Sequence, residues 1–167
     1  MDGGAGQVLI RPRLTWRPAF MCVSLADVSS GTPTSMRTSN RQVVLETLEA
    51  FSAGDMATVM SRLADDVTWT FFGSHRFSGT LRGKEALTKG LFEVVGAVLK
   101  AGIEVRINTV TVDGDRVIVE AKGRAESNSG LAYNNDYCLV FELADGRIQH
   151  VRQYLDSELV THVFGPR

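Results

Sequence analysis

The chain has 167 residues, of which 44% are hydrophobic and 22% are charged, with a formal net charge of −1. These values suit one globular domain with a single core, and the near-neutral balance lacks the basic excess of nucleic-acid-binding proteins. No apolar run is long enough to span a membrane. The two cysteines, Cys22 and Cys138, have no metal-ligand spacing. We therefore expect free thiols, a cytoplasmic location, and neither nucleic-acid nor membrane partners.

Residues 1–38 differ in composition from the rest of the chain. They hold three of the four prolines and are rich in arginine but poor in acidic residues. No periodic apolar face runs through them, so we predict a disordered N-terminal extension. Two origins stay open for it. It is either an over-extended reading frame with Met36 as the natural start, or a targeting segment.

From residue 39 onward, helices are predicted first. Apolar residues recur at helical spacing over 40–53, 55–63 and 84–100. Ser39 or Asn40 can cap the first of these helices, and Asp55 can cap the second.

Strands follow the helices, apart from one early strand over 67–72 that leads into a loop over 73–83. The others are joined by tight turns and are expected over 103–112, 116–127 and 133–156, the last range being a hairpin. Helices followed by antiparallel strands indicate an α+β fold. We predict a cone-shaped, curved antiparallel sheet packed on three helices, ending in a short tail without regular structure from residue 157.

The hairpin over 133–156 has the clearest pattern, because Asp145-Gly146 supplies the positive φ angles of a two-residue turn. On its second strand, alternation separates a polar row from a mixed row. The polar row is His150, Arg152, Tyr154 and Asp156, and the mixed row is Gln149, Val151, Gln153 and Leu155. The polar row is either a solvated outer face or the lining of a pocket, and alternation alone leaves both open.

Several short motifs occur in a characteristic order and spacing. They are Phe-Ser-Ala-Gly-Asp at 51–55, and further segments at 63–69, 77–86, 130–137, 145–148 and 152–156. Together they resemble the SnoaL-like branch of the nuclear transport factor 2-like (ketosteroid isomerase-like) superfamily. The resemblance covers about residues 40–160, so we assign 39–160 to this domain and 161–167 to a C-terminal tail. It implies an interior pocket. The superfamily includes polyketide cyclases, isomerases, epoxide hydrolases and non-enzymatic binders, so it does not define the activity.

The resemblance implies that Arg152, Tyr154 and Asp156 face the pocket, where Asp156 matches an acid or base of several relatives. A carboxylate in an apolar pocket has a raised pKa unless it is paired, which suits proton transfer. Arg152 would orient Asp156, and His150 would assist. A satisfied ion pair with no substrate is the structural alternative.

Arg124 also enters through the resemblance. Arg124-Ala-Glu126 with Asp156 is similar to the acid–arginine–base set of limonene-epoxide-hydrolase-like relatives. Glu replaces Asp at 126, and the water-positioning Tyr-x-Asn of those enzymes falls on Trp69-Thr-Phe71. Neither aromatic can anchor a water nucleophile, which makes an epoxide hydrolase the least favoured activity.

The other pocket candidates are mostly apolar. Trp69, Phe71 and Phe92 are suited to a flat hydrophobic ligand, although core packing is the favoured explanation for each of them taken singly. Tyr137 offers a hydroxyl group to a ligand, and His75 is a second candidate for the assisting histidine.

Two functional hypotheses follow. The first is a cyclase or isomerase that needs no metal or cofactor and uses Asp156, Arg152 and His150. The second is a non-catalytic ligand-binding or dimerisation module. A small hydrophobic molecule is the expected partner in both. A homodimer is also expected through the open face of the sheet. Apolar residues suited to that face are Val119, Ala121, Val151 and Leu155.

Overall fold

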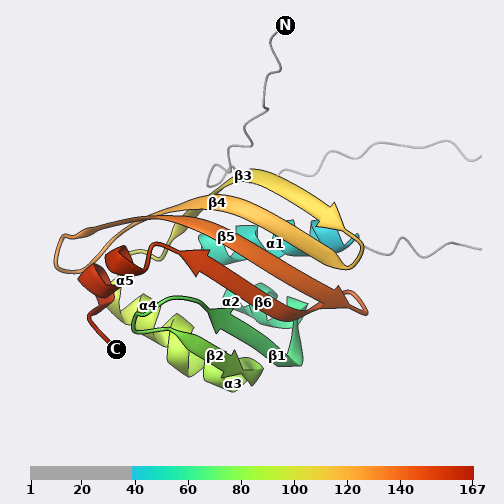
Figure 1. Ribbon diagram of the computed structural model, residues 1–167, viewed down its shortest axis with the longest axis horizontal. Coiled ribbons are helices and arrows are strands. Elements are labelled where there is room, and N and C mark those ends of the chain that lie inside the picture. The colour runs from blue at the N-terminus through green and yellow to red at the C-terminus, as the bar shows by residue number, and fades with distance from the viewer. Residues whose placement is uncertain (1–38) are drawn as a thin grey trace, which may run out of the picture.

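The structure is a computed structural model that describes residues 39–167, so the predictions made for residues 1–38 lie outside the described range. Its elements are α1 (Asn40–Ala53), α2 (Met56–Arg62), β1 (Leu63–Phe71), β2 (Gly79–Arg82), α3 (Gly83–Leu87), the π-helical turn η1 (Thr88–Phe92), α4 (Glu93–Val98), β3 (Glu104–Asp113), β4 (Arg116–Glu126), β5 (Ala132–Ala144), β6 (Arg147–Leu155) and α5 (Ser157–Phe164). Figure 1 shows one curved sheet with α1 to α4 gathered on one side of it. No helix within residues 39–167 is long and apolar enough to cross a membrane.

The three expected helices are present, and their boundaries have local causes. The Ser39 hydroxyl accepts a hydrogen bond from the Gln42 N–H (3.2 Å) and caps α1, which ends at Gly54 in the left-handed conformation. The Asp55 carboxylate accepts one from the Thr58 N–H (3.0 Å) and caps α2. The third expected helix is a continuous helical segment made of α3, η1 and α4.

The six strands form one sheet in the order β2-β1-β6-β5-β4-β3. Strands β3 to β6 are an antiparallel meander, as the tight turns predicted, and β2 pairs antiparallel with β1. Strand β1 differs, because it pairs parallel with β6. The prediction of a fully antiparallel sheet was therefore wrong for the pairing of β1 with β6. No hairpin sets the direction of β1 against β6, since most of the domain separates them in sequence.

The hairpin of β5 and β6 turns where expected, with φ of 51° at Asp145 and 72° at Gly146. The alternation of inward and outward side chains along β6 is interrupted shortly after this turn, at Gln149. Leu143 is paired with Ile148 and Glu142 with His150, so Gln149 is an extra residue in β6. This bulge lets Ile148 and Val151 both enter the core although they are three positions apart.

Two elements were missed from the sequence. Strand β2 lies inside the expected loop over 73–83, and its four residues are all at least partly exposed, so they lack a strand's apolar signal. Helix α5 occupies most of the expected tail after residue 157. Figure 1 places it at the end of the sheet where β6 finishes. Val160 and Phe164 are buried beneath it, and the Gly165-Pro166 stop falls after the helix rather than in place of it.

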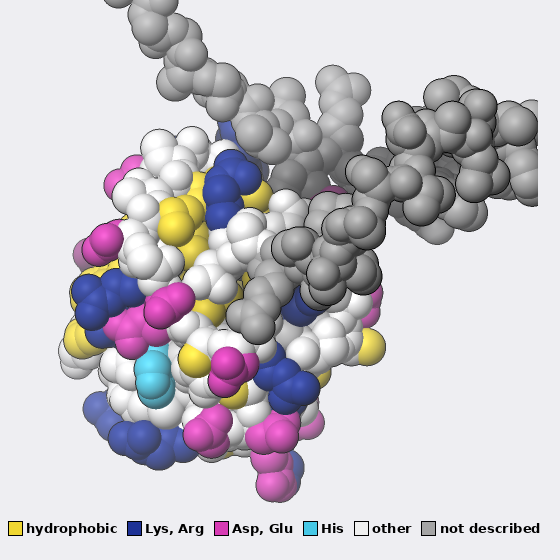
Figure 2. Space-filling model, turned by 90° about the vertical axis from the view of Figure 1, so that its right-hand side faces the viewer, with side chains coloured by type: hydrophobic (Ala, Val, Ile, Leu, Met, Phe, Trp, Pro, Cys, Tyr) yellow, Lys and Arg dark blue, Asp and Glu magenta, His cyan; other side chains and the backbone are white. Residues whose placement is uncertain are grey.

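The apolar residues expected on the open face lie on the other side of the sheet. Val119, Ala121 and Val151 are buried in the core, and Leu155 lines the cavity described below. The apolar residues on which the expected homodimer was based are therefore absent from the outer face of the sheet, and the homodimer stays a prediction. The end of the molecule in Figure 2 shows basic and acidic side chains interspersed rather than gathered by sign.

A close approach between β4 and β5 shapes the inside of the sheet. A Cβ atom at Gly123 would lie 2.6 Å from Cε2 of Tyr137 and 2.8 Å from Cγ2 of Ile103. Only a residue without a side chain leaves room for the Tyr137 ring against the backbone of β4. Gly123 therefore fixes where this ring lies.

Gly123→Ala should lower the free energy of unfolding by about 1–3 kcal/mol, because the Tyr137 ring and Ile103 must both shift. Gly96→Ala is the matched control. Nothing lies within 4 Å of a Cβ at Gly96 in α4, so the helix should be unchanged or stabilised by up to about 1 kcal/mol. Equal effects of the two substitutions in urea denaturation would contradict the packing assigned to Gly123.

Candidate ligand-binding pocket

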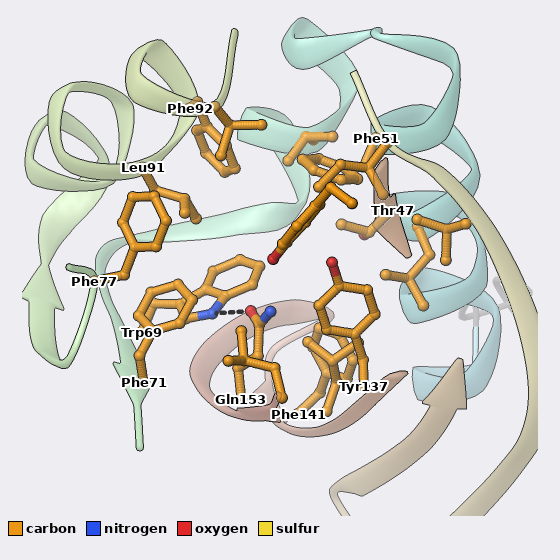
Figure 3. Close-up of a pocket in the computed structure, with 18 of the residues that line it drawn as sticks. Thr47, Phe51, Trp69, Phe71, Phe77, Leu91, Phe92, Tyr137, Phe141 and Gln153 are labelled. Atoms are coloured by element: carbon orange, nitrogen blue, oxygen red, sulfur yellow. Dashed lines mark hydrogen bonds between the residues drawn. The ribbon is translucent and has the colours of Figure 1, made fainter. Parts of the chain in front are cut away.

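A cavity of about 70 Å³ lies between the helices and the inner face of the sheet. Its wall comes from segments far apart in sequence, as Figure 3 shows. Thr47 and Phe51 come from α1, Trp69 and Phe71 from β1, and Leu91 and Phe92 from the π-helical turn. Strands β5 and β6 complete it with side chains that include Tyr137 and Gln153.

Aromatic rings dominate this wall. Trp69 is stacked on Phe71 with ring centroids 6.2 Å apart, and Phe92 meets Trp69 edge-on at 6.3 Å. Phe51 is tilted against Phe92 at 6.1 Å. Stacked and edge-on faces of this kind complement another flat ring.

The turn η1 delivers Leu91 and Phe92 to the cavity. The N–H of Glu93 bonds the carbonyl of Thr88, five residues earlier, which is the π-helical pattern. Such turns occur often at functional sites. Leu91 is buried, whereas Phe92 is only half-buried.

The cavity contains few polar groups. The Trp69 indole Nε1–H donates a hydrogen bond to Oε1 of Gln153 (2.9 Å), and Nδ2 of Asn135 donates one to the Tyr133 hydroxyl (3.4 Å). The hydroxyl of Tyr137 is buried and makes no hydrogen bond of 3.5 Å or less among residues 39–167, and the Tyr133 phenol is its polar neighbour. Burial raises the pKa of Tyr137 far above its ordinary value, and the adjacent Tyr133 phenol adds to this increase.

No carboxylate, histidine or basic side chain is among the described residues that line the cavity. Burial also raises the pKa of Tyr133, so both phenols are neutral hydrogen-bonding groups at physiological pH. This lining can bind and orient a ligand, but it offers no group that exchanges a proton near neutral pH. No group of three or more His, Cys, Asp or Glu side chains within residues 39–167 is placed to hold a metal ion.

Four of the sequence-derived candidates do line the cavity, namely Trp69, Phe71, Phe92 and Tyr137. The sequence did not single out Gln153 or Phe51 as site residues. A signal for Gln153 existed, because it lies opposite Leu139, which belongs to the apolar face of β5. Directly paired residues point to the same face of a sheet.

The polar row of β6 lies on the outer face, which corrects the inward placement that the resemblance implied. His150 Nδ1 is 2.8 Å from the Thr68 hydroxyl, and Arg152 pairs with Glu142 at 2.7 Å. Tyr154 is 43% exposed and stacks on Phe72 with centroids 4.6 Å apart. These contacts run across the outer surface of the sheet.

Arg124 and Glu126 also point outward, and Glu126 pairs with Lys100. The solvated-strand interpretation of this face of β4 was therefore correct. The arginine and carboxylates that would form an epoxide-hydrolase set do not converge on the cavity.

Within residues 39–167, Asp156 neither borders the cavity nor contacts an arginine. It is exposed, and its Oδ1 accepts hydrogen bonds from the N–H groups of Glu158 (2.9 Å) and Leu159 (3.1 Å). These contacts make Asp156 the N-cap of α5. An N-cap requires no apolar surroundings, so the premise of a buried, proton-accepting carboxylate is wrong.

His75 is buried behind the cavity wall and has both ring nitrogens occupied. Nε2 lies 3.1 Å from the carbonyl oxygen of Phe72, and Nδ1 accepts a hydrogen bond from the Phe77 N–H (3.2 Å). This pattern assigns the proton to Nε2 and the neutral state to the ring. Burial lowers the pKa of His75, and the bond to Phe72 opposes that decrease.

The sequence also defines the family. Residues 44–151, more than half of the chain, match the family described as the SnoaL-like domain. The chain therefore belongs to the SnoaL-like domain family, in agreement with the resemblance of its motifs. None of the curated proteins matches it.

Solved structures share the fold. An NTF2-like protein of Burkholderia pseudomallei K96243 is 23% identical with a TM-score of 0.67, covering 75% of this chain and 96% of its own. A putative SnoaL-like polyketide cyclase of Jannaschia sp. CCS1 is 21% identical with a TM-score of 0.65, covering 81% and 98%. An LEH-like epoxide hydrolase of M. tuberculosis is 28% identical with a TM-score of 0.61, covering 75% and 88%. These similarities confirm the NTF2-like α+β fold.

The stability of the domain should fall as the pH decreases through the ordinary titration range of histidine. The folded pKa of His75 is lowered, so below about pH 6.5 the unfolded chain takes up a proton that the folded chain does not bind. Urea denaturation at about pH 7.5 and about pH 5.5 measures this loss. His75→Gln should reduce the difference. An unchanged pH dependence in His75→Gln would contradict this assignment.

Asp156→Ala should lower the free energy of unfolding by about 1 kcal/mol, because α5 loses its cap. Asp156→Asn should be close to neutral, since asparagine caps helices as well as aspartate does. Thermal and urea denaturation check both values. If the asparagine variant is destabilised as much as the alanine variant, the negative charge rather than the cap is what α5 requires.

Proposed function

We propose that this SnoaL-like domain binds a small, largely hydrocarbon molecule in its aromatic-lined cavity. The observation that carries the proposal is a largely apolar, partly open cavity between the helices and the sheet, with a few placed polar groups in its wall. Ligand pockets commonly have this composition. It is the ligand-binding alternative of the two hypotheses that the sequence left open.

The size of the cavity favours a ligand with one ring. An apolar cavity of about 150 Å³ accepts benzene, and the present cavity of about 70 Å³ is roughly half of that. Entry of a ring therefore requires side chains to move. Phe51 and Phe92 suit this role, because both are only partly buried at the cavity wall.

Binding without catalysis is favoured over proton transfer. The cyclase or isomerase hypothesis needed Asp156, Arg152 and His150 in the cavity, and all three lie outside it. The likeness to the epoxide hydrolase of M. tuberculosis does not restore an activity, because Arg124 and Glu126 also point away from the cavity.

The test uses the full chain and α-methylstyrene as a one-ring hydrocarbon probe. Trp69 is the reporter, since its indole N–H lies in the cavity wall. A Trp16→Phe background leaves one indole signal in ¹H–¹⁵N NMR spectra. We expect this signal to shift saturably as the probe is added.

Two variants of α4 make the test specific. Val95→Phe fills the cavity, because Val95 lines it, and should weaken binding by about tenfold or more. Val94→Phe is the control, since its neighbour Val94 does not line the cavity. The proposal is overturned if the Trp69 signal does not move, or if Val95→Phe binds as well as Val94→Phe.

A further inference from the structure

We infer that the cavity selects neutral carbonyl compounds, through a donor pair formed by the Tyr137 hydroxyl and the side-chain amide NH₂ of Gln153. This inference rests on the proposed ligand-binding function and names the ligand class. Figure 3 shows both side chains reaching into the same cavity, Tyr137 from β5 and Gln153 from β6.

Tyr137 is the first donor. Its side chain is buried with 8% exposure, and its hydroxyl makes no hydrogen bond of 3.5 Å or less among the described residues, although the Tyr133 phenol is near enough to interact with it. A buried donor that lacks a good acceptor destabilises the folded state. The ring cannot turn easily away from this position, because it lies directly against the backbone of Gly123. A ligand oxygen would supply the missing partner.

Gln153 is the second donor, and Trp69 fixes its orientation. An indole N–H can only donate a hydrogen bond, so it selects the oxygen of the Gln153 amide. The NH₂ group must then point the other way. In Figure 3 the amide nitrogen lies on the side facing Tyr137, away from the bond to Trp69. The Trp69–Gln153 bond thus presents a second donor to the cavity.

Two donors in an apolar wall define the ligand by exclusion as well as by attraction. A carbonyl oxygen has two lone pairs and can accept from both groups, whereas a hydrocarbon of the same shape leaves both donors unpaired. A carboxylate would be buried without a cation, since no basic side chain among residues 39–167 lines the cavity. A ring-bearing ketone or quinone satisfies every condition.

The experiment compares acetophenone with α-methylstyrene, which differ only in C=O against C=CH₂. Both are titrated into the Trp16→Phe background and followed at the Trp69 indole N–H. We expect acetophenone to bind about tenfold tighter, as one or two net hydrogen bonds would give. Tyr137→Phe and Gln153→Met should each reduce this preference to about threefold or less. Gln149→Met on the outer bulge of β6 should keep it.

Folding stability separates this role from a structural one. Tyr137→Phe removes a hydroxyl without a partner, so the free energy of unfolding should stay the same or rise. A clear loss of stability in Tyr137→Phe would show that the hydroxyl serves the fold and would overturn the inference.

The outcomes distinguish the two proposals. If neither compound binds, the ligand-binding function itself fails, and the inference fails with it. If both bind equally well to the unsubstituted cavity, the inference is overturned while the hydrophobic site stands. The same holds if the acetophenone preference survives in Tyr137→Phe and in Gln153→Met.

Discussion

The register between β5 and β6 determines which side chains of three strands meet in the middle of the molecule. Leu155, Gln153 and Val151 lie opposite Tyr137, Leu139 and Phe141, so both sets point into the core. Strand β6 is also the neighbour of β1 in the sheet, where Val151 is paired with Trp69 and Gln153 with Phe71. A shift of one residue would turn each of these side chains outward. The cavity wall of the sheet is therefore the product of one hairpin alignment.

The sequence predicted the parts of the fold that depend on local signals. Ser39 and Asp55 cap helices where their side-chain chemistry suggested, and Asp145-Gly146 forms the hairpin turn. Strand β2 and helix α5 were missed for a physical reason. Strand β2 has no buried residue, and α5 is only eight residues long although its buried Val160 and Phe164 have helical spacing. Both elements are stabilised by contacts with distant segments. The parallel pairing of β1 with β6 is likewise a tertiary result.

The candidate site was only half predictable. The aromatic members, such as Trp69 and Phe92, were found because large apolar side chains collect in the interior of any fold. The polar members were misplaced, because alternation groups residues by face but does not say which face is inside. The resemblance to relatives put the row of Arg152 and Asp156 inside. Val151 and Gln153 lie opposite apolar residues of β5 that point inward. Considering which residues pair across the hairpin would therefore have placed Val151 and Gln153, and not the polar row, on the inner face.

The interior of this domain is less stable than it would be if it were fully packed. A void of about 70 Å³ corresponds to about 2 kcal/mol, at about 24 cal/mol for each Å³. The unpaired Tyr137 hydroxyl adds about 1–3 kcal/mol. Native proteins have a free energy of unfolding of about 5–15 kcal/mol, so this loss is a considerable fraction of the total. Larger apolar side chains at the wall would remove most of it, so the cost is understandable where the space has a use.

The π-helical turn η1 shows that a single inserted residue can make the difference between a core with a cavity and a closed core. In a regular α-helix each residue advances about 100° around the axis. A turn that spans five residues instead of four therefore changes the helical phase by one position. Loss of one residue from Thr88–Phe92 would return the segment to α-helical phase and rotate Phe92 relative to α4. Within a family that has many activities, the gain or loss of one codon here would change the shape of the cavity and leave the other elements of the fold in place.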